Sequence, residues 1–173
     1  MDETPSAGQE MMESLCVGCG MCCDGTLHPI AIVVPGQEKA VNRVGLEVTK
    51  VDGKQFFAQP CPMFKGHCCS IYNQRPSVCR TYRCALLENV TDRNVTLKEA
   101  RDKVQTARSL IFKVACHNPE AVLSANRSMV WRLLMDKLTG ADEVDKGSIA
   151  NALLNVVALD EFLTKWFRTK SSP

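Results

Sequence analysis

The stretch that decides the fold begins with CVGCGMCC at residues 16–23 and ends with CRTYRC at residues 79–84. Nine of the ten cysteines lie in this stretch, and only Cys116 lies outside it. A thiolate is a soft, charged ligand, and two thiolates separated by two residues can bind one cation from a tight turn. The clustering of the cysteines therefore indicates a metal site.

The composition excludes several classes of protein. A chain of 173 residues with 45% hydrophobic and 23% charged residues can bury a core in one domain, or in one domain with an appendage. The net charge of +2 gives no electrostatic reason to expect binding to nucleic acid or to a membrane surface. No apolar run approaches the roughly 18 residues of a spanning helix, and the acidic start at Met1–Pro5 does not resemble a signal peptide. We therefore expect a cytoplasmic protein.

Clustered cysteines in a reducing cytosol are more often metal ligands or redox groups than disulfides. Two pairs of adjacent cysteines, Cys22–Cys23 and Cys68–Cys69, agree with this, because neighbouring cysteines are awkward partners for each other in a disulfide. One or both members of such a pair can instead turn toward a shared metal. The sequence therefore favours thiol ligands over a disulfide framework.

Short elements are predicted around the two cysteine blocks, after a tail at residues 1–15 that has no hydrophobic periodicity. Glycines in the first block, such as Gly20, allow the backbone to adopt positive φ and to wrap closely around a metal. After this block the sequence predicts a buried strand or extended segment at 30–34 and a short helix at 37–44 that ends at Gly45. A hairpin follows, with strands at 46–51 and 54–58 around Asp52-Gly53. A second short helix begins at Pro76. These elements form a small α/β region that metal ligands would staple together.

A helical region is predicted from residue 91 onward. Thr96-Leu97-Lys98-Glu99 has the pattern of a capping box and begins a helix that ends near His117. Asn118 begins a second helix that ends near Gly140, and Ser148 caps a third. We therefore expect an α+β protein with a flexible tail at 1–15, a cysteine-rich metal-binding domain at 16–90, and three C-terminal helices at 91–173 that pack on it.

Spacing alone leaves the identity of the metal open. The first block supplies three thiols in succession at Cys16, Cys19 and Cys22, and the second block adds those of Cys61, Cys68, Cys69, Cys79 and Cys84. A zinc ribbon would have a second Cys-x2-Cys pair, which the second block lacks. The Cys-x2-Cys-x2-Cys run with a separate Cys-Pro is similar to iron–sulfur ligation but lacks the full ferredoxin spacing. The sequence indicates iron, an iron–sulfur cluster or zinc, with the cluster slightly favoured.

The cysteines also resemble those of a known family. Five segments carry this resemblance: C-x2-C-G-x-C-C at 16–23, CPMF at 61–64, CSIY at 69–72, RPxxCR at 75–80 and YxC at 82–84. They are similar to the CxxCxxCC or YkgJ-type cysteine-cluster family of zinc- or iron-chelating proteins. The resemblance ends at about residue 84 and leaves the helical part outside. It implies eight metal ligands, namely Cys16, Cys19, Cys22, Cys23, Cys61, Cys69, Cys79 and Cys84. Cys68 falls outside the pattern.

The resemblance implies chelation rather than a particular reaction. One branch with a similar domain, the flagellin lysine N-methylases, implies an iron–sulfur cluster, but its chains are longer and this sequence has no glycine-rich turn for a methyl donor. Three hypotheses follow: a metal-binding protein, a metal-dependent enzyme (an oxidoreductase or, less favoured, a lysine methylase-like enzyme), and a structural zinc module whose helices bind a protein partner. No carboxylate–histidine set lies near the cysteines in the sequence, so no catalytic residue is assigned.

Several residues beside the cysteines have predicted supporting roles. Arg75 and Arg80 would offset the negative charge of the thiolates and donate hydrogen bonds to them, or alternatively bind an anionic substrate. Tyr72 would cover the site against solvent. His67 is expected to be an exposed loop residue, and Cys116 a small buried hydrophobic residue on a helix.

Overall fold

The computed structural model describes residues 15–66, 68–117, 139 and 143–169. His67 and nearly all of the helix predicted to begin at Asn118 lie outside the described residues. The chain divides into two compact units, Met1–Arg83 and Cys84–Pro173, and each is described by itself. The mixture of helices with small antiparallel sheets confirms the predicted α+β class.

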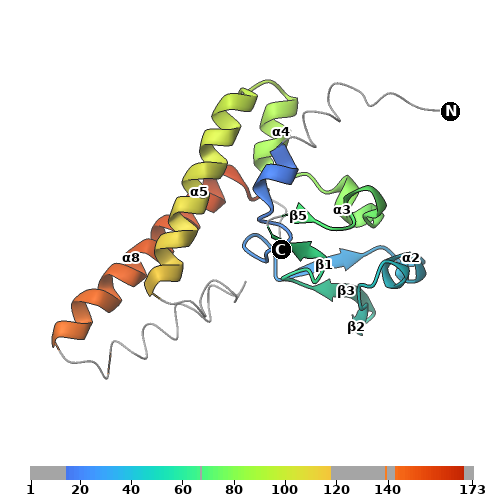
Figure 1. Ribbon diagram of the computed structural model, residues 1–173, viewed down its shortest axis with the longest axis horizontal. Coiled ribbons are helices and arrows are strands. Elements are labelled where there is room, and N and C mark those ends of the chain that lie inside the picture. The colour runs from blue at the N-terminus through green and yellow to red at the C-terminus, as the bar shows by residue number, and fades with distance from the viewer. Residues whose placement is uncertain (1–14, 67, 118–138, 140–142, 170–173) are drawn as a thin grey trace. The chain divides into compact units, whose positions relative to one another are not determined.

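In the first unit, three short strands form an antiparallel sheet with the order β1-β3-β2 (Figure 1). The strands are β1 (Ile30–Val33), β2 (Thr49–Val51) and β3 (Lys54–Ala58), and helix α2 (Glu38–Arg43) lies between β1 and β2 in the chain. The turn of the β2–β3 hairpin has φ angles of 48° at Asp52 and 77° at Gly53. Two successive positive φ angles match the twist of the flanking strands, which explains Asp-Gly at this turn. The predicted short helix and hairpin are confirmed.

Strand β1 buries one face rather than both. Val33 is buried, whereas Ile30 and Ile32 are 37% and 50% exposed. Successive side chains of a strand point to opposite faces of the sheet, and an antiparallel sheet can leave one face open to water. The predicted strand is confirmed, but the expectation that the whole run is buried is wrong for these two isoleucines and for Val34, which is also exposed.

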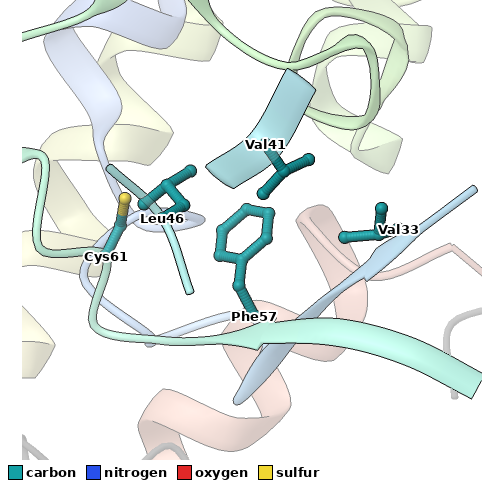
Figure 2. Close-up of a cluster of buried hydrophobic side chains, with 5 residues drawn as sticks. All are labelled: Val33, Val41, Leu46, Phe57 and Cys61. Atoms are coloured by element: carbon teal, nitrogen blue, oxygen red, sulfur yellow. The ribbon is translucent and has the colours of Figure 1, made fainter. Parts of the chain in front are cut away.

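A cluster of buried side chains packs around the sheet and α2. It contains Val33, Val41, Leu46, Phe57 and Cys61. Figure 2 shows the Phe57 ring directed from β3 toward Val41 on α2, with Leu46 and Cys61 to one side and Val33 to the other. A cysteine sulfur therefore forms part of the apolar packing of the first unit.

A second, two-stranded sheet pairs β4 (Phe64–Lys65) with β5 (Cys68–Cys69) and places Phe64 opposite Cys69. A 3-10 turn, η1 (Tyr72–Gln74), and helix α3 (Ser77–Thr81) follow. Pro76 precedes α3, as the sequence predicts. β4, β5 and η1 are not predicted from the sequence, because elements of two or three residues contain too little periodicity to mark them.

The second unit is helical. It contains α4 (Ala85–Thr91), α5 (Leu97–His117) and α8 (Glu143–Trp166), and α5 packs against both α4 and α8 (Figure 1). Its buried side chains include Leu86, Leu87, Val90, Ala100, Val104, Ala107, Val114, Ala152, Leu153, Val156 and Leu163. Among the described helices, none is long and apolar enough to span a membrane.

The capping box at the start of α5 is confirmed by reciprocal hydrogen bonds. The backbone N–H and the hydroxyl of Thr96 donate to Glu99 Oε2 at 2.8 and 2.7 Å, and the Glu99 N–H donates to Thr96 Oγ1 at 3.2 Å. These bonds satisfy N–H groups that have no partner within the first turn of a helix. Cys116, near the other end of α5, is exposed, so the expectation that it is buried is wrong.

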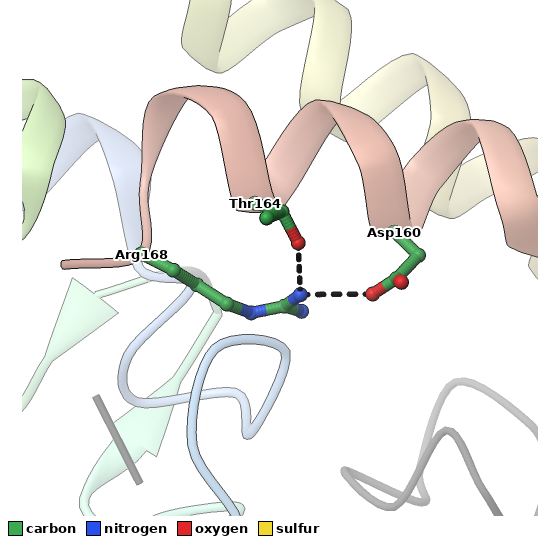
Figure 3. A network of polar contacts seen from close by, with 3 residues as sticks. All are labelled: Asp160, Thr164 and Arg168. Carbon is green, nitrogen blue, oxygen red and sulfur yellow. Dashed lines mark hydrogen bonds and ion pairs between the residues drawn. The ribbon is translucent and has the colours of Figure 1, made fainter. Parts of the chain in front are cut away.

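Helix α8 begins at Glu143, five residues before the predicted cap at Ser148. Ser148 is an exposed residue inside the helix, so its interpretation as an N-cap is wrong. Just beyond the last residue of α8, Arg168 folds back, and its Nη1 donates to Asp160 Oδ1 and Thr164 Oγ1, both at 2.8 Å (Figure 3). A cation at this end of a helix also interacts favourably with the helix dipole.

Candidate metal centre

Four cysteines from four separate segments of the first unit lie near one another. Cys23 is in the turn after the helical residues 15–19, Cys61 follows β3, Cys69 is in β5 and Cys79 is in α3. Cys61 belongs to the buried cluster, and Cys23 and Cys79 pack against that cluster. Cys69 acts electrostatically on the thiols of the other three. We call these four residues the thiol quartet.

Two local contacts bring the first cysteine block to the second. The Cys61 N–H donates to the Cys23 carbonyl oxygen at 2.7 Å. Gly20 has φ +69°, and a Cβ atom built there would lie 2.5 Å from the Phe64 ring. Only glycine allows both this backbone conformation and this close approach. The predicted glycine-rich turn therefore lies against β4, the strand that pairs with β5 and places Phe64 opposite Cys69.

Burial and mutual repulsion both act on the quartet. Burial, followed by the charges of Cys61, Cys69 and Cys79, raises the pKa of the Cys23 thiol from 9.0 to about 12. Burial, followed by Cys61 and Cys69, raises the pKa of Cys79 to about 11, and the Arg75 guanidinium opposes this increase. Since a buried anion is disfavoured in apolar surroundings and near like charges, these thiols are neutral at neutral pH in the absence of a cation.

Backbone amides favour the ionised form of Cys61. Burial raises the pKa of Cys61, whereas hydrogen bonding from the backbone of Met63 and Phe64 lowers it. Amides directed at a cysteine sulfur stabilise thiolate charge whether or not that sulfur also binds a metal. The Cys-Pro-Met-Phe segment thus supplies both a soft donor and a local source of positive potential.

The donor set fits a soft metal ion, although the described residues do not enclose one. Among them, no group of three or more His, Cys, Asp or Glu side chains is arranged to hold a metal as it stands. The charges of Cys61 and Cys69 nevertheless act on the thiols of both Cys23 and Cys79.

The other four cysteines implied by the family resemblance occupy different positions. Cys16 and Cys19 lie on the helical turn at residues 15–19, and Cys22 follows directly before Cys23. Cys84 precedes α4 in the second unit, where burial raises its pKa and the amides of Leu86 and Leu87 lower it. The quartet is therefore defined by the thiols that act on Cys23 and Cys79, and these other four cysteines stay predicted ligands.

Cys68 lies outside the quartet for a geometric reason. It precedes Cys69 in β5, and successive side chains in a strand point to opposite faces. Cys68 is exposed, whereas Cys69 is half-buried. All ten cysteines lie in the described residues, and none of them forms a disulfide. This arrangement agrees with the predicted preference for thiol ligands over a disulfide framework.

The residues expected to support the cysteines are not equivalent. Arg75 acts on Cys79 and stacks on Tyr72, whereas Arg80 is exposed on α3. Sequence reasoning missed a contact between His28 Nε2 and Tyr82 Oη, which are 2.6 Å apart. The two rings meet edge to face, with centroids 5.1 Å apart. No local signal could have indicated this pair, because 54 residues separate its members.

The fold and the clustered thiols define the class of small, cysteine-rich α+β domains. Within that class, the model of the CxxCxxCC family, described as "Putative zinc- or iron-chelating domain", matches residues 15–116, more than half of the chain. The chain therefore belongs to this family, which confirms the resemblance seen in the sequence. The match includes α4 and α5, so the expectation that the helical part lies outside the family is wrong up to residue 116. No curated protein and no solved structure matches the chain.

Proposed function

We propose that this protein binds a zinc or iron ion through the thiolates of Cys23, Cys61, Cys69 and Cys79. The supporting observation is the convergence of these four thiols, from four segments of the first unit, beside one apolar cluster. Four thiolates satisfy the tetrahedral coordination of zinc, and they are equally the usual ligand set of iron–sulfur clusters.

The composition of the quartet favours a structural or chelating role over catalysis. Catalytic zinc sites keep one position open for water or substrate, whereas sites with four protein thiolates are closed and structural. Ligation would join the turn after residue 19, the loop after β3, β5 and α3, which are otherwise short elements. Metal binding and folding of the first unit would then be coupled. A reducing cytoplasm, which we propose as the compartment, would keep the thiols available.

Cys16, Cys19, Cys22 and Cys84 remain proposed ligands on the family resemblance alone. They would bind a second metal or complete an iron–sulfur cluster, the form that the Cys-x2-Cys-x2-Cys run slightly favours. This division of the eight cysteines into the quartet and a remainder makes a quantitative prediction. Replacing a quartet cysteine with serine should release the metal bound by the quartet. Replacing Cys16 with serine should release the other metal and leave the quartet metal in place.

The test is metal analysis of protein purified without oxygen, together with its visible spectrum. Stoichiometric zinc in a colourless protein identifies a zinc site, and stoichiometric iron with sulfide in a brown protein identifies a cluster. Neither metal in the purified protein, combined with no uptake of zinc or iron by the reduced protein, would overturn the proposal.

Two adjacent cysteines provide a matched pair for the same measurement. Cys69→Ser should lose the quartet metal, because serine is a poor ligand for zinc or iron in a thiolate site. Cys68→Ser makes the same chemical change one residue earlier, on the opposite face of β5, and should retain wild-type metal content. Equal loss from both variants would show that the quartet is wrongly assigned.

A further inference from the structure

One face of the three-stranded sheet is apolar. The register of the strands determines which side chains share it, since Ile32 of β1 and Thr49 of β2 both lie opposite Phe56 of β3. Directly opposite residues of antiparallel strands project from the same face of a sheet, and every second residue returns to that face. We call this surface the open face, and its apolar members are Ile30, Ile32, Val34, Val51, Phe56 and Ala58.

The other face of the sheet is covered by helix α2. Val33 and Phe57 belong to the buried cluster, and Figure 2 shows the Phe57 ring directed toward this helix. Gln55 Nε2 also donates a hydrogen bond to Glu38 Oε1 on α2. Since Val33, Gln55 and Phe57 alternate along their strands with residues of the open face, α2 lies on the opposite side of the sheet.

The open face is exposed to solvent. Ile32, Val34 and Val51 are 50%, 55% and 50% exposed, and Ile30 is 37% exposed. These four are half of the eight exposed large hydrophobic side chains found among the described residues. Apolar side chains scattered singly over a surface are ordinary, whereas a contiguous apolar patch marks a binding site. The open face is such a patch.

Two residues of opposite charge lie at opposite ends of the open face. Lys54 lies opposite Val51, at the end of the sheet where the β2–β3 hairpin turns. Glu47 lies before the start of β2 and is exposed, whereas its neighbours Leu46 and Val48 pack in or against the buried cluster. This alternation directs Glu47 to the open face. The open face is therefore positive at one end and negative at the other.

We propose that the open face binds the open face of a second copy of this chain, with the strands of the two copies antiparallel. A two-fold axis that crosses the strands at Phe56 places Ile32 and Phe56 against their own counterparts, as an isologous interface requires. It also brings Lys54 of each copy to the end that carries Glu47 of the other. The parallel arrangement would instead place the two lysines together, which like-charge repulsion disfavours. Two sheets commonly pack face to face with their strands nearly aligned.

The size of the open face predicts a reversible dimer. A strand spacing of about 4.8 Å and a rise of about 3.4 Å per residue give the face dimensions of roughly 14 by 17 Å. This is less than the roughly 800 Å² per partner that a stable protein interface buries. We therefore expect association that depends on protein concentration, and this expectation does not depend on the proposed metal-binding function.

The test is analytical ultracentrifugation of the full chain under reducing conditions, which exclude disulfide-linked dimers through the exposed Cys68 and Cys116. The average mass should rise from that of a monomer toward that of a dimer between about 1 μM and about 1 mM protein. Ile32→Lys places a charge at the centre of the interface and should weaken association by about 10-fold or more. Leu154→Lys makes a matched change at a 67% exposed apolar residue on α8 and should associate like the wild type. Unchanged methyl resonances of Val33 would show that Ile32→Lys still folds.

A charge exchange tests the antiparallel arrangement without touching the apolar residues. Lys54→Glu and Glu47→Lys each place like charges together between the two copies and should weaken association. The double variant Glu47→Lys/Lys54→Glu restores opposite charges at both ends and should recover it, which only a second copy of this face would allow. A monomer at every concentration would overturn the proposal and assign the open face to another partner. Equal weakening by Ile32→Lys and Leu154→Lys, or no recovery in the double variant, would also overturn it.

Discussion

The two units of the chain are stabilised in different ways. In the first unit the strands have two to five residues, and helices α2 and α3 have six and five. In the second unit α5 and α8 have 21 and 24 residues and bury apolar side chains between them. Long amphipathic helices can stabilise each other by packing alone. Short strands and single turns of helix need a further source of stability.

Under the proposed function, the thiol quartet would supply this further stability. The buried cluster of the first unit is small and includes the sulfur of Cys61. Small scaffolds with few buried residues commonly depend on a disulfide or a structural metal. Since none of the cysteines forms a disulfide, ligation by the quartet would supply the cross-links of the first unit, and the second unit, which contains no quartet cysteine, would not depend on the quartet. This contrast leads to three predictions.

The largest predicted effect follows metal removal under reducing conditions. A chelator should destabilise the first unit by most of its folding free energy, because metal-binding energy is folding energy in such sites. In urea, the methyl resonances of Val33 and Val41, buried in the first unit, should collapse toward unfolded positions at a much lower concentration than in the metal-bound protein. Those of Val114 and Val156, buried in the second unit, should remain dispersed. Loss of both sets together would show that the units do not differ in this way.

The local features of the first unit could be predicted because they depend on single residues. Asp52-Gly53 marks a hairpin since both positions need positive φ, and Gly45 ends α2 with φ +81°. The Thr96–Glu99 capping box is equally local. The start of α8 could not be located at Ser148, because a serine is compatible with several helix positions and packing decides among them. The predicted protein partner of the helical region remains a prediction.

The eight candidate ligands stay a prediction from the sequence, and their proposed division could not be predicted from spacing. Cys22 and Cys23 are adjacent, and only tertiary contacts, such as the hydrogen bond from the Cys61 N–H to the Cys23 carbonyl oxygen, distinguish them. Arg75 and Arg80 lie on either side of Cys79 in the sequence, yet Arg75 is stacked on Tyr72 whereas Arg80 is exposed. Spacing defines which residues could meet, and the chain path defines which do.

The second prediction concerns the residual stability of the metal-free first unit as pH rises. The pKa of Cys23 is raised from 9.0 to about 12, and that of Cys79 to about 11, so both are neutral in the folded protein where they would ionise in the unfolded chain. This contribution to stability is fully present below pH 9.0 and is lost as pH rises toward about 12. The urea midpoint, monitored by the Val33 and Val41 methyl resonances, should therefore be lower at about pH 10 than at about pH 8, because the ordinary thiol pKa of 9.0 lies between these two values.

The metal-bound protein is the control for this pH dependence. Its quartet thiolates are already ionised, so the same change in pH should leave the metal-bound midpoint nearly constant. Metal-free Cys23→Ala lacks one of the buried thiols and should show a weaker dependence than the metal-free wild type. A metal-free midpoint that rises with pH would contradict the neutral, buried state of these thiols.

The smallest predicted effect lies in the second unit and should leave the metal untouched. Thr96→Ala removes the hydroxyl that accepts the Glu99 N–H at 3.2 Å and donates to Glu99 Oε2 at 2.7 Å. Loss of an N-cap typically costs about 1 kcal/mol, so the urea midpoint followed by the Val114 methyl resonance should decrease. Thr106→Ala is the matched control, since its exposed hydroxyl only bonds the Asp102 carbonyl within α5, and alanine is the better helix former there. Both variants should retain wild-type metal content, because the cap belongs to the unit whose folding does not require the quartet; metal loss from Thr96→Ala would show instead that the two units fold as one.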